Sequence, residues 1–192
     1  MEAKFSQRVK DVLAFSREEA MRLGNDYIGI EHLMLGIIRD GEGIAIQILS
    51  YLEVNLSELK KSIEQAIGKN SSKSLKDFTN IPLVKQAEKA LKITYLEAKL
   101  HKSEIIGTEH LLLAILKDEE NIVTKILSSS GINYSVIKEQ MGNIQNVKDD
   151  DVKFNPKSEM PGSFSDEPED EEKSYGSTSK KISDSKSKTP VL

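Results

Sequence analysis

The sequence predicts an all-α fold made of two tandem four-helix repeats. Apolar residues recur at helical spacing, the helical pattern occurs twice around one motif, and no alternating pattern typical of strands competes with it. The motif reads YIGIEHLMLGIIRD from Tyr27 and IIGTEHLLLAILKD from Ile105. We expect the two units to pack as one pseudo-twofold domain, because each alone would leave an apolar face exposed.

A constant offset relates the two copies without a gap. Gly29 corresponds to Gly107, and 107 minus 29 gives an offset of 78 residues. The same offset holds before, within and after the motif, where it pairs Leu13 with Leu91, Glu19 with Glu97, Ala20 with Ala98, His32 with His110, Leu33 with Leu111, and Asn55 with Asn133. A match of this length indicates a tandem duplication.

Each copy contains four stretches with helical apolar spacing. The first stretch is an amphipathic helix, marked in copy one by Val9, Leu13 and Ala20. The next two are short apolar helices, expected at residues 33–38 and 44–52 and again at 111–116 and 122–127. The fourth helix is expected to begin after Ser57 in copy one and after Ser135 in copy two, both as N-caps.

Other residues indicate where helices begin. Ser6 precedes the first helix and can cap it, and Thr108 is expected to cap the sixth. Pro82 suits the first turn of the fifth helix, where its missing N–H would have no partner anyway.

Four segments follow from this pattern. Residues 1–67 form the first repeat, 68–80 a polar connector, 81–142 the second repeat, and 143–192 a tail. The tail combines Pro, Gly and Ser with an acidic block at 166–172 and a Lys-Ser block at 180–188, so we expect a disordered, solvated tether.

The composition excludes several functions. The chain lacks cysteine, and its 27 Lys and Arg against 31 Asp and Glu give a formal charge of -4, which opposes binding to nucleic acid or an anionic membrane. The sequence contains neither a G-x-x-x-x-G-K-[ST] phosphate loop nor a G-x-S-x-G elbow. The N-terminus lacks the features of a secretory signal. We therefore expect a cytoplasmic protein without catalytic activity, metal or cofactor.

The repeated Glu-His pair is the main candidate for chemistry. A helical zinc site places two His one turn apart, whereas each motif here has a single His beside a Glu, so His32 and His110 are expected to be structural. Glu31 and Glu109 fall in the first turn of a helix. They either complement the helix dipole or bind a guanidinium beside amides that bind an anion.

These residues carry a family resemblance. Over about residues 4–142 both copies, including the G-x-E-H-L-L-L-x-[IL] helix start and the R-D-G-E-G turn, resemble the double Clp N-terminal repeat of ClpC-type AAA+ unfoldases. The closing KTPVL resembles the segment that leads into the first ATPase module of such proteins.

The resemblance implies a receptor domain of an ATP-dependent chaperone that delivers proteins to a ClpP-type peptidase. Its partners would be adaptors and substrates, the isolated domain would be a monomer, and ATP and Mg would belong only to the absent ATPase modules. One alternative is a freestanding Clp accessory protein of the same fold. A metal hydrolase and a helical nucleic-acid binder are the weaker alternatives.

In some members of this family the domain binds phosphorylated arginine at two sites. Carried over by position, the resemblance pairs Glu31 with Ser6, and Glu109 with the residue at 81. That residue is Ile81, where the family has a Thr, so the second site would lack a hydroxyl. Ile30 stands where the second copy has Thr108, which predicts a weaker cap there.

Overall fold

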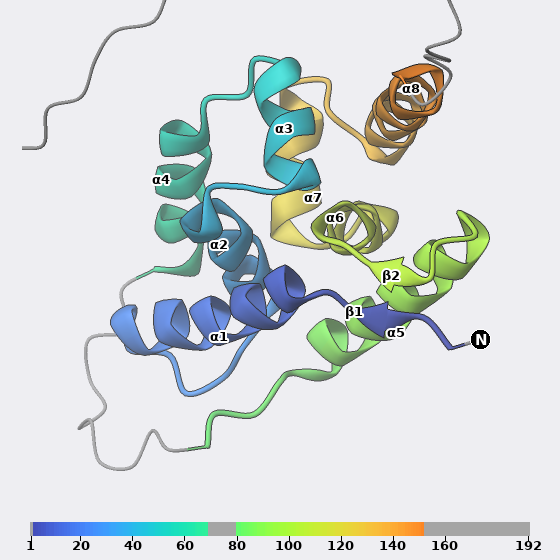
Figure 1. The fold of residues 1–192 in the computed structure, drawn as a ribbon. Coiled ribbons are helices and arrows are strands. Elements are labelled where there is room, and N and C mark those ends of the chain that lie inside the picture. The colour runs from blue at the N-terminus through green and yellow to red at the C-terminus, as the bar shows by residue number, and fades with distance from the viewer. Residues whose placement is uncertain (1, 69–79, 152–192) are drawn as a thin grey trace, which may run out of the picture. The chain divides into compact units, whose positions relative to one another are not determined.

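The computed structural model describes residues 2–68 and 80–151, which lie within one compact unit, Met1–Phe154. The predicted all-α fold of four helices per repeat is confirmed for these residues (Figure 1). The first repeat contains β1 Lys4–Phe5, α1 Gln7–Arg22, α2 Ile30–Asp40, α3 Ile44–Tyr51 and α4 Leu56–Ile67. The second contains α5 Lys85–Leu100, β2 Ile105–Ile106, α6 Thr108–Lys117, α7 Ile122–Ser129 and α8 Tyr134–Asp151.

The repeats exchange short extended segments just before their helices. β1 pairs in parallel with β2 (Figure 1), with Phe5 opposite Ile106. Ile28 forms the matching parallel bridge with Leu83. Because 5 plus 78 is 83 and 28 plus 78 is 106, the two pairings are equivalent under the offset. The sequence did not predict these strands, since two residues are too few for an alternating pattern.

The helices across the interface follow the same symmetry. α1 contacts α6 as α5 contacts α2, and α2 contacts α7 as α6 contacts α3. The short helices α2 and α6 lie at the centre, where Leu33 and Leu111 are fully buried. One hydrophobic core joins both copies, so the duplication supplies each apolar face with its cover.

Several predicted helix starts need correction. Asn55, not Ser57, caps α4, because its Oδ1 accepts from the backbone N–H of Ser57 and of Glu58. In the second copy α8 begins at Tyr134, ahead of Ser135, and the Asn133 side chain accepts from the Val136 N–H. Asparagine and serine are both good N-caps, and the prediction took the serine two residues after the asparagine.

Two further predictions about helix starts are wrong. Pro82 precedes α5, and its carbonyl accepts a hydrogen bond from the Ile28 N–H. Thr108 is the first residue of α6 rather than its cap, and its Oγ1 accepts from the Ala45 N–H at the start of α3. The prediction for Ser6 is confirmed, since its Oγ accepts from the Val9 N–H.

The last helix passes the predicted domain boundary at residue 142. α8 continues to Asp151, and Ile144 packs against the core, so the second repeat is longer than expected. The rest of the predicted tail, and residues 69–79 of the predicted connector, lie outside the described residues. Among the described residues, no helix is long and apolar enough to cross a membrane.

Candidate functional site

The Gly-x-Glu-His motif forms the same helix start in both copies. The Gly29 N–H donates to Nδ1 of His32 at 2.9 Å, and the Gly107 N–H donates to Nδ1 of His110 at 2.9 Å. The ring thus takes the role of the glutamate or glutamine in a capping box. The cap does not involve Ile30, which is buried as the first residue of α2, so the prediction that Ile30 weakens the cap is wrong.

Both histidines are buried and neutral. Burial, the main cause, lowers the pKa of His32 and of His110 to about 4, and a ring whose Nδ1 accepts a hydrogen bond cannot carry a proton there. His32 Nε2 lies 2.9 Å from Asn25 Oδ1. As expected for structural histidines, each ring hydrogen-bonds locally at its own helix start. Within the described ranges, no three His, Asp or Glu side chains form a group that could hold a metal ion.

The motif glutamates fold back over their own glycines. A Cβ built on Gly29 would overlap the Glu31 carboxylate, and one on Gly107 would overlap that of Glu109. A larger residue at either cap would therefore displace the glutamate carboxylate, and the backbone there has an ordinary extended φ. Glu109 is 7% exposed, whereas Glu31 is half-buried beside Tyr27. Burial, followed by the charge of Glu31, raises the pKa of Tyr27.

The structure combines the candidate residues differently from the expectation. The Ser6 N–H donates to the carbonyl of Ile106 at 3.0 Å, which places Ser6 beside the start of α6, with Thr108 and Glu109, rather than beside Glu31. The exchanged segments therefore bring together helix starts from different repeats. The start of α1 meets the start of α6, which carries Glu109, and the start of α5 meets the segment before α2, which carries Glu31.

The second end is built on Val84. Its N–H donates to the carbonyl of Ile28 at 3.0 Å, and it caps α5 without a side-chain hydrogen bond. Val84, since 84 minus 78 is 6, is the counterpart of Ser6, whereas Ile81 is a core residue. The predicted position 81 was therefore wrong, although a hydroxyl is indeed missing from this helix start.

We refer to these two composite sites as the Ser6/Glu109 end and the Val84/Glu31 end. In each, the first-turn amides of one helix, which have no acceptor within their own helix, follow a segment that is hydrogen-bonded to the start of a second helix, and that second helix carries a motif glutamate. Such a pair can hold an anion and a cation at the same time. The ends differ in that the first has the hydroxyl and the more covered glutamate, while the second has the more open glutamate.

Sequence reasoning missed the ion pairs that brace each repeat. Glu19 accepts from Arg22 at 2.6 Å and from Arg39 at 3.2 Å. Its counterpart Glu97 accepts from Lys117 at 2.7 Å and from the Tyr134 hydroxyl at 3.0 Å. The offset already matched the two glutamates. It also matches Arg39 with Lys117, and these basic residues were the signal in the sequence that could have predicted the ion pairs.

The R-D-G-E-G turn is also held by a residue that the sequence did not single out. Arg8, on the first turn of α1, donates from Nη1 to Asp40 at 2.9 Å and from Nη2 to Glu42 at 3.1 Å. In the second copy Gln86 donates to Asp118 at 2.9 Å. Both contacts attach the C-terminal end of the motif helix to the first helix of its own repeat.

The fold and its paired helix starts define an all-α tandem-repeat domain. Comparison with known proteins gives the family, because the model of the Clp repeat (R) N-terminal domain matches residues 4–130. The chain belongs to this family, whose members include the N-terminal domains of ClpC- and ClpA-type chaperones.

Among its relatives are ClpC/MecB of Bacillus subtilis (strain 168), described as a negative regulator of genetic competence, and chaperone protein ClpC2, chloroplastic, of Arabidopsis thaliana. The first is 33% identical over 141 residues, which cover 73% of this chain and 17% of that protein. The second is 33% identical over 138 residues, which cover 72% and 14%. The chain thus spans about a sixth of their length.

Solved structures agree in fold. The N-terminal domain of the chaperone ClpD from Arabidopsis thaliana has a TM-score of 0.56 at 16% identity, and the match covers 72% of this chain and 94% of that one. The Hsp104 N-terminal domain from Candida albicans has a TM-score of 0.59 at 18% identity, with 71% and 88% covered.

Proposed function

We propose that this chain is the substrate- and adaptor-receiving domain of a ClpC-type ATP-dependent chaperone that unfolds proteins for a ClpP-type peptidase. Membership of the Clp N-terminal family supports this role. In this proposal ATP, Mg and the peptidase are bound by other parts of the assembly. The domain acts as a cytoplasmic, monomeric receptor that raises the local concentration of a client.

The two composite helix starts support phosphorylated arginine as the mark that is recognised. A phosphoguanidinium group carries an anionic phosphate next to planar N–H donors. Its site therefore needs amide donors for the phosphate and, a few ångströms away, an acceptor for the N–H groups. At the Ser6/Glu109 end the first-turn amides of α1 and the Ser6 hydroxyl would hold the phosphate, with the guanidinium nitrogens donating to Glu109. The exchanged strands, which join the two helix starts, are the observation that carries this assignment.

The two ends would bind with different strength. The Val84/Glu31 end has no hydroxyl for the phosphate, but its glutamate is the more accessible, and Lys85 adds a positive charge in the first turn of α5. The Thr108 Oγ1 already accepts a hydrogen bond from the Ala45 N–H. Thr108 therefore contributes its backbone, rather than its hydroxyl, to the Ser6/Glu109 end. We propose that Ser6, Glu31, Thr108 and Glu109 act at two ends rather than in the pairs suggested by the sequence.

A domain replacement tests the receptor role. The N-terminal domain of a ClpC-type relative is exchanged for this chain, and degradation of an N-domain-dependent substrate by the chaperone with its peptidase is measured. We expect degradation well above that of the domain-deleted chaperone. A chimaera that hydrolyses ATP normally yet degrades such a substrate no faster than the deletion would overturn the proposal.

A further inference from the structure

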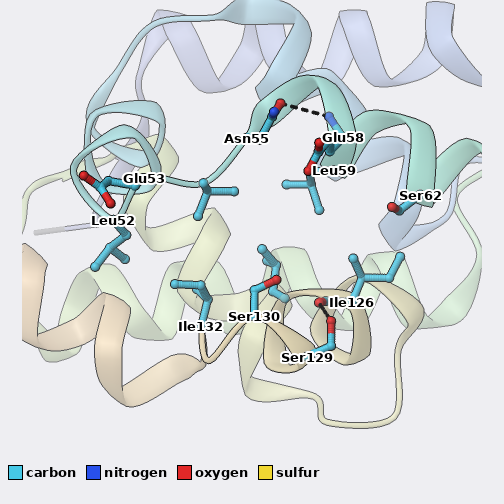
Figure 2. Close-up of a pocket in the computed structure, with 12 residues that line it drawn as sticks. Leu52, Glu53, Asn55, Glu58, Leu59, Ser62, Ile126, Ser129, Ser130 and Ile132 are labelled. Atoms are coloured by element: carbon cyan, nitrogen blue, oxygen red, sulfur yellow. Dashed lines mark hydrogen bonds between the residues drawn. The ribbon is translucent and has the colours of Figure 1, made fainter.

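A groove separate from the Ser6/Glu109 and Val84/Glu31 ends runs between α4 of the first repeat and α7 of the second. Figure 2 shows Leu59 on one wall, with Ile126 and Ile132 on the other, facing a shared space. Its cavity volume is about 330 Å³, near the lower end of ligand pockets, which span about 300–1,000 Å³. The groove therefore has room for one or two side chains of a partner. We call it the α4/α7 groove.

The rim of the α4/α7 groove is acidic. Glu53 and Glu58 line it on the α4 side, both are exposed, and the described lining contains no Lys or Arg (Figure 2). Glu53 has a φ of 58°, a left-handed conformation that is costly for a residue other than glycine. Its counterpart at the end of α7 is Gly131, with a φ of 76°, so the first copy holds a carboxylate where the second holds none.

The duplication provides an internal comparison. Applying the offset to this lining gives the equivalent positions between α3 and α8, which also contact each other. There Gly131 and Val136 replace Glu53 and Glu58, and Tyr51, which is 73% exposed, replaces Ser129. The shared scaffold accounts for the apolar floor of the groove, whereas both acids occur on one side of the pseudo-twofold only.

We propose that the α4/α7 groove docks a segment of a client or adaptor protein in which an apolar side chain is flanked by Lys or Arg. The apolar side chain contacts Leu59, Ile126 and Ile132, while the flanking cations pair with Glu53 and Glu58. The charge of the rim decides the occupant, since an acidic or neutral segment would leave two carboxylates uncompensated at the contact. This inference rests on the proposed receptor function and adds a second surface to it.

The test uses the 192-residue chain and defined peptides. A twelve-residue Gly-Ser peptide with a central Lys-Leu-Lys is titrated to about 1 mM, a concentration that detects weak complexes, and backbone amide shifts are followed by NMR. Two control peptides carry Lys-Ser-Lys and Glu-Leu-Glu at the centre. We expect saturable shifts at groove residues with the first peptide. Either control peptide should bind with an affinity at least about tenfold lower.

Protein variants separate the rim from general charge. Glu58→Lys is expected to weaken binding at least about tenfold. Glu139→Lys, an equal charge reversal at an exposed position of α8, is expected to leave binding within about twofold. The inference is overturned by equal binding of the three peptides, by shifts located elsewhere, or by equal effects of the two variants. Shifts that depend on protein concentration without peptide would assign the groove to a second copy and also overturn it.

Failure here is distinguishable from failure of the receptor function. A chimaera that degrades its substrate equally well with Glu58→Lys, combined with no peptide binding, removes the groove and leaves the receptor role intact. If the peptide binds the groove but the chimaera does not degrade its substrate, the groove stands and the receptor role is removed.

Discussion

The backbone N–H of Gly107 donates a hydrogen bond of 2.9 Å to Nδ1 of His110, and the first repeat forms the same bond between Gly29 and His32. This bond explains why the histidine recurs in the motif. The neutral ring caps a buried helix start from inside the helix, and the same turn directs the neighbouring glutamate back over the glycine.

The first prediction concerns pH. His32 and His110 have folded-state pKa values of about 4, below the ordinary value of 6.5, so the unfolded chain binds more protons in this window. Their contribution to stability is complete above about pH 6.5 and is lost as the pH falls towards 4. We expect the urea midpoint to decrease over this range. The double variant His32→Gln/His110→Gln keeps a side-chain acceptor that does not titrate, and should show a flatter decrease. Equal slopes would contradict the assigned role.

The second prediction concerns the packing of α1 on α2. A Cβ at Gly36 would lie 2.6 Å from the carbonyl oxygen of Val12. We expect Gly36→Ala to destabilise the fold by about 1–3 kcal/mol, because two helices must move apart. Gly142→Ala is the matched control, since its Cβ meets open space and the substitution should be neutral or stabilising by up to about 1 kcal/mol. Chemical unfolding measures both, and a neutral Gly36→Ala would contradict the close contact.

The third prediction concerns the Val84/Glu31 end. Val84 already has the extended conformation of an N-cap, with φ -69° and ψ 155°, but contributes no side-chain acceptor. Val84→Thr should be more stable than Val84→Ala by about 0.5–2 kcal/mol, the typical value of a cap, because both variants lose the contact of the Val84 side chain with the core. Under the proposed function it should also strengthen binding of an arginine-phosphorylated peptide at this end. Val84→Ala supplies neither effect and is the control, and a Thr variant no more stable than Ala would contradict the assignment of the cap.

The sequence was sufficient to predict the helices and their duplication because both depend on local periodicity. The 78-residue offset even relates contacts that were not predicted, such as those of Glu19 and Glu97. It was not sufficient to predict which helix starts meet. The meeting of Ser6 with the start of α6 depends on strands of two residues, which leave no pattern in the sequence.

Helix limits were predicted less well for a similar reason. Asn55 and Ser57 are two residues apart and of comparable quality as caps, and only the backbone geometry selects the first. The continuation of α8 past Gly142 depends on Ile144 packing against the core, whereas the polar composition around it indicated a linker. The first case was decided by local backbone geometry and the second by a tertiary contact.

In the proposed arrangement, each site joins a helix start of one repeat to a glutamate of the other. Calorimetric titration with an arginine-phosphorylated peptide and its unphosphorylated twin tests it most directly. We expect saturable binding of the phosphorylated peptide alone. Ser6→Ala and Glu109→Ala should weaken the same site and leave the other unchanged, with helicity preserved in both variants. The composite sites would be contradicted if Ser6→Ala and Glu31→Ala weakened one site while Glu109→Ala weakened the other. If neither peptide bound, phosphoarginine would be contradicted as the ligand.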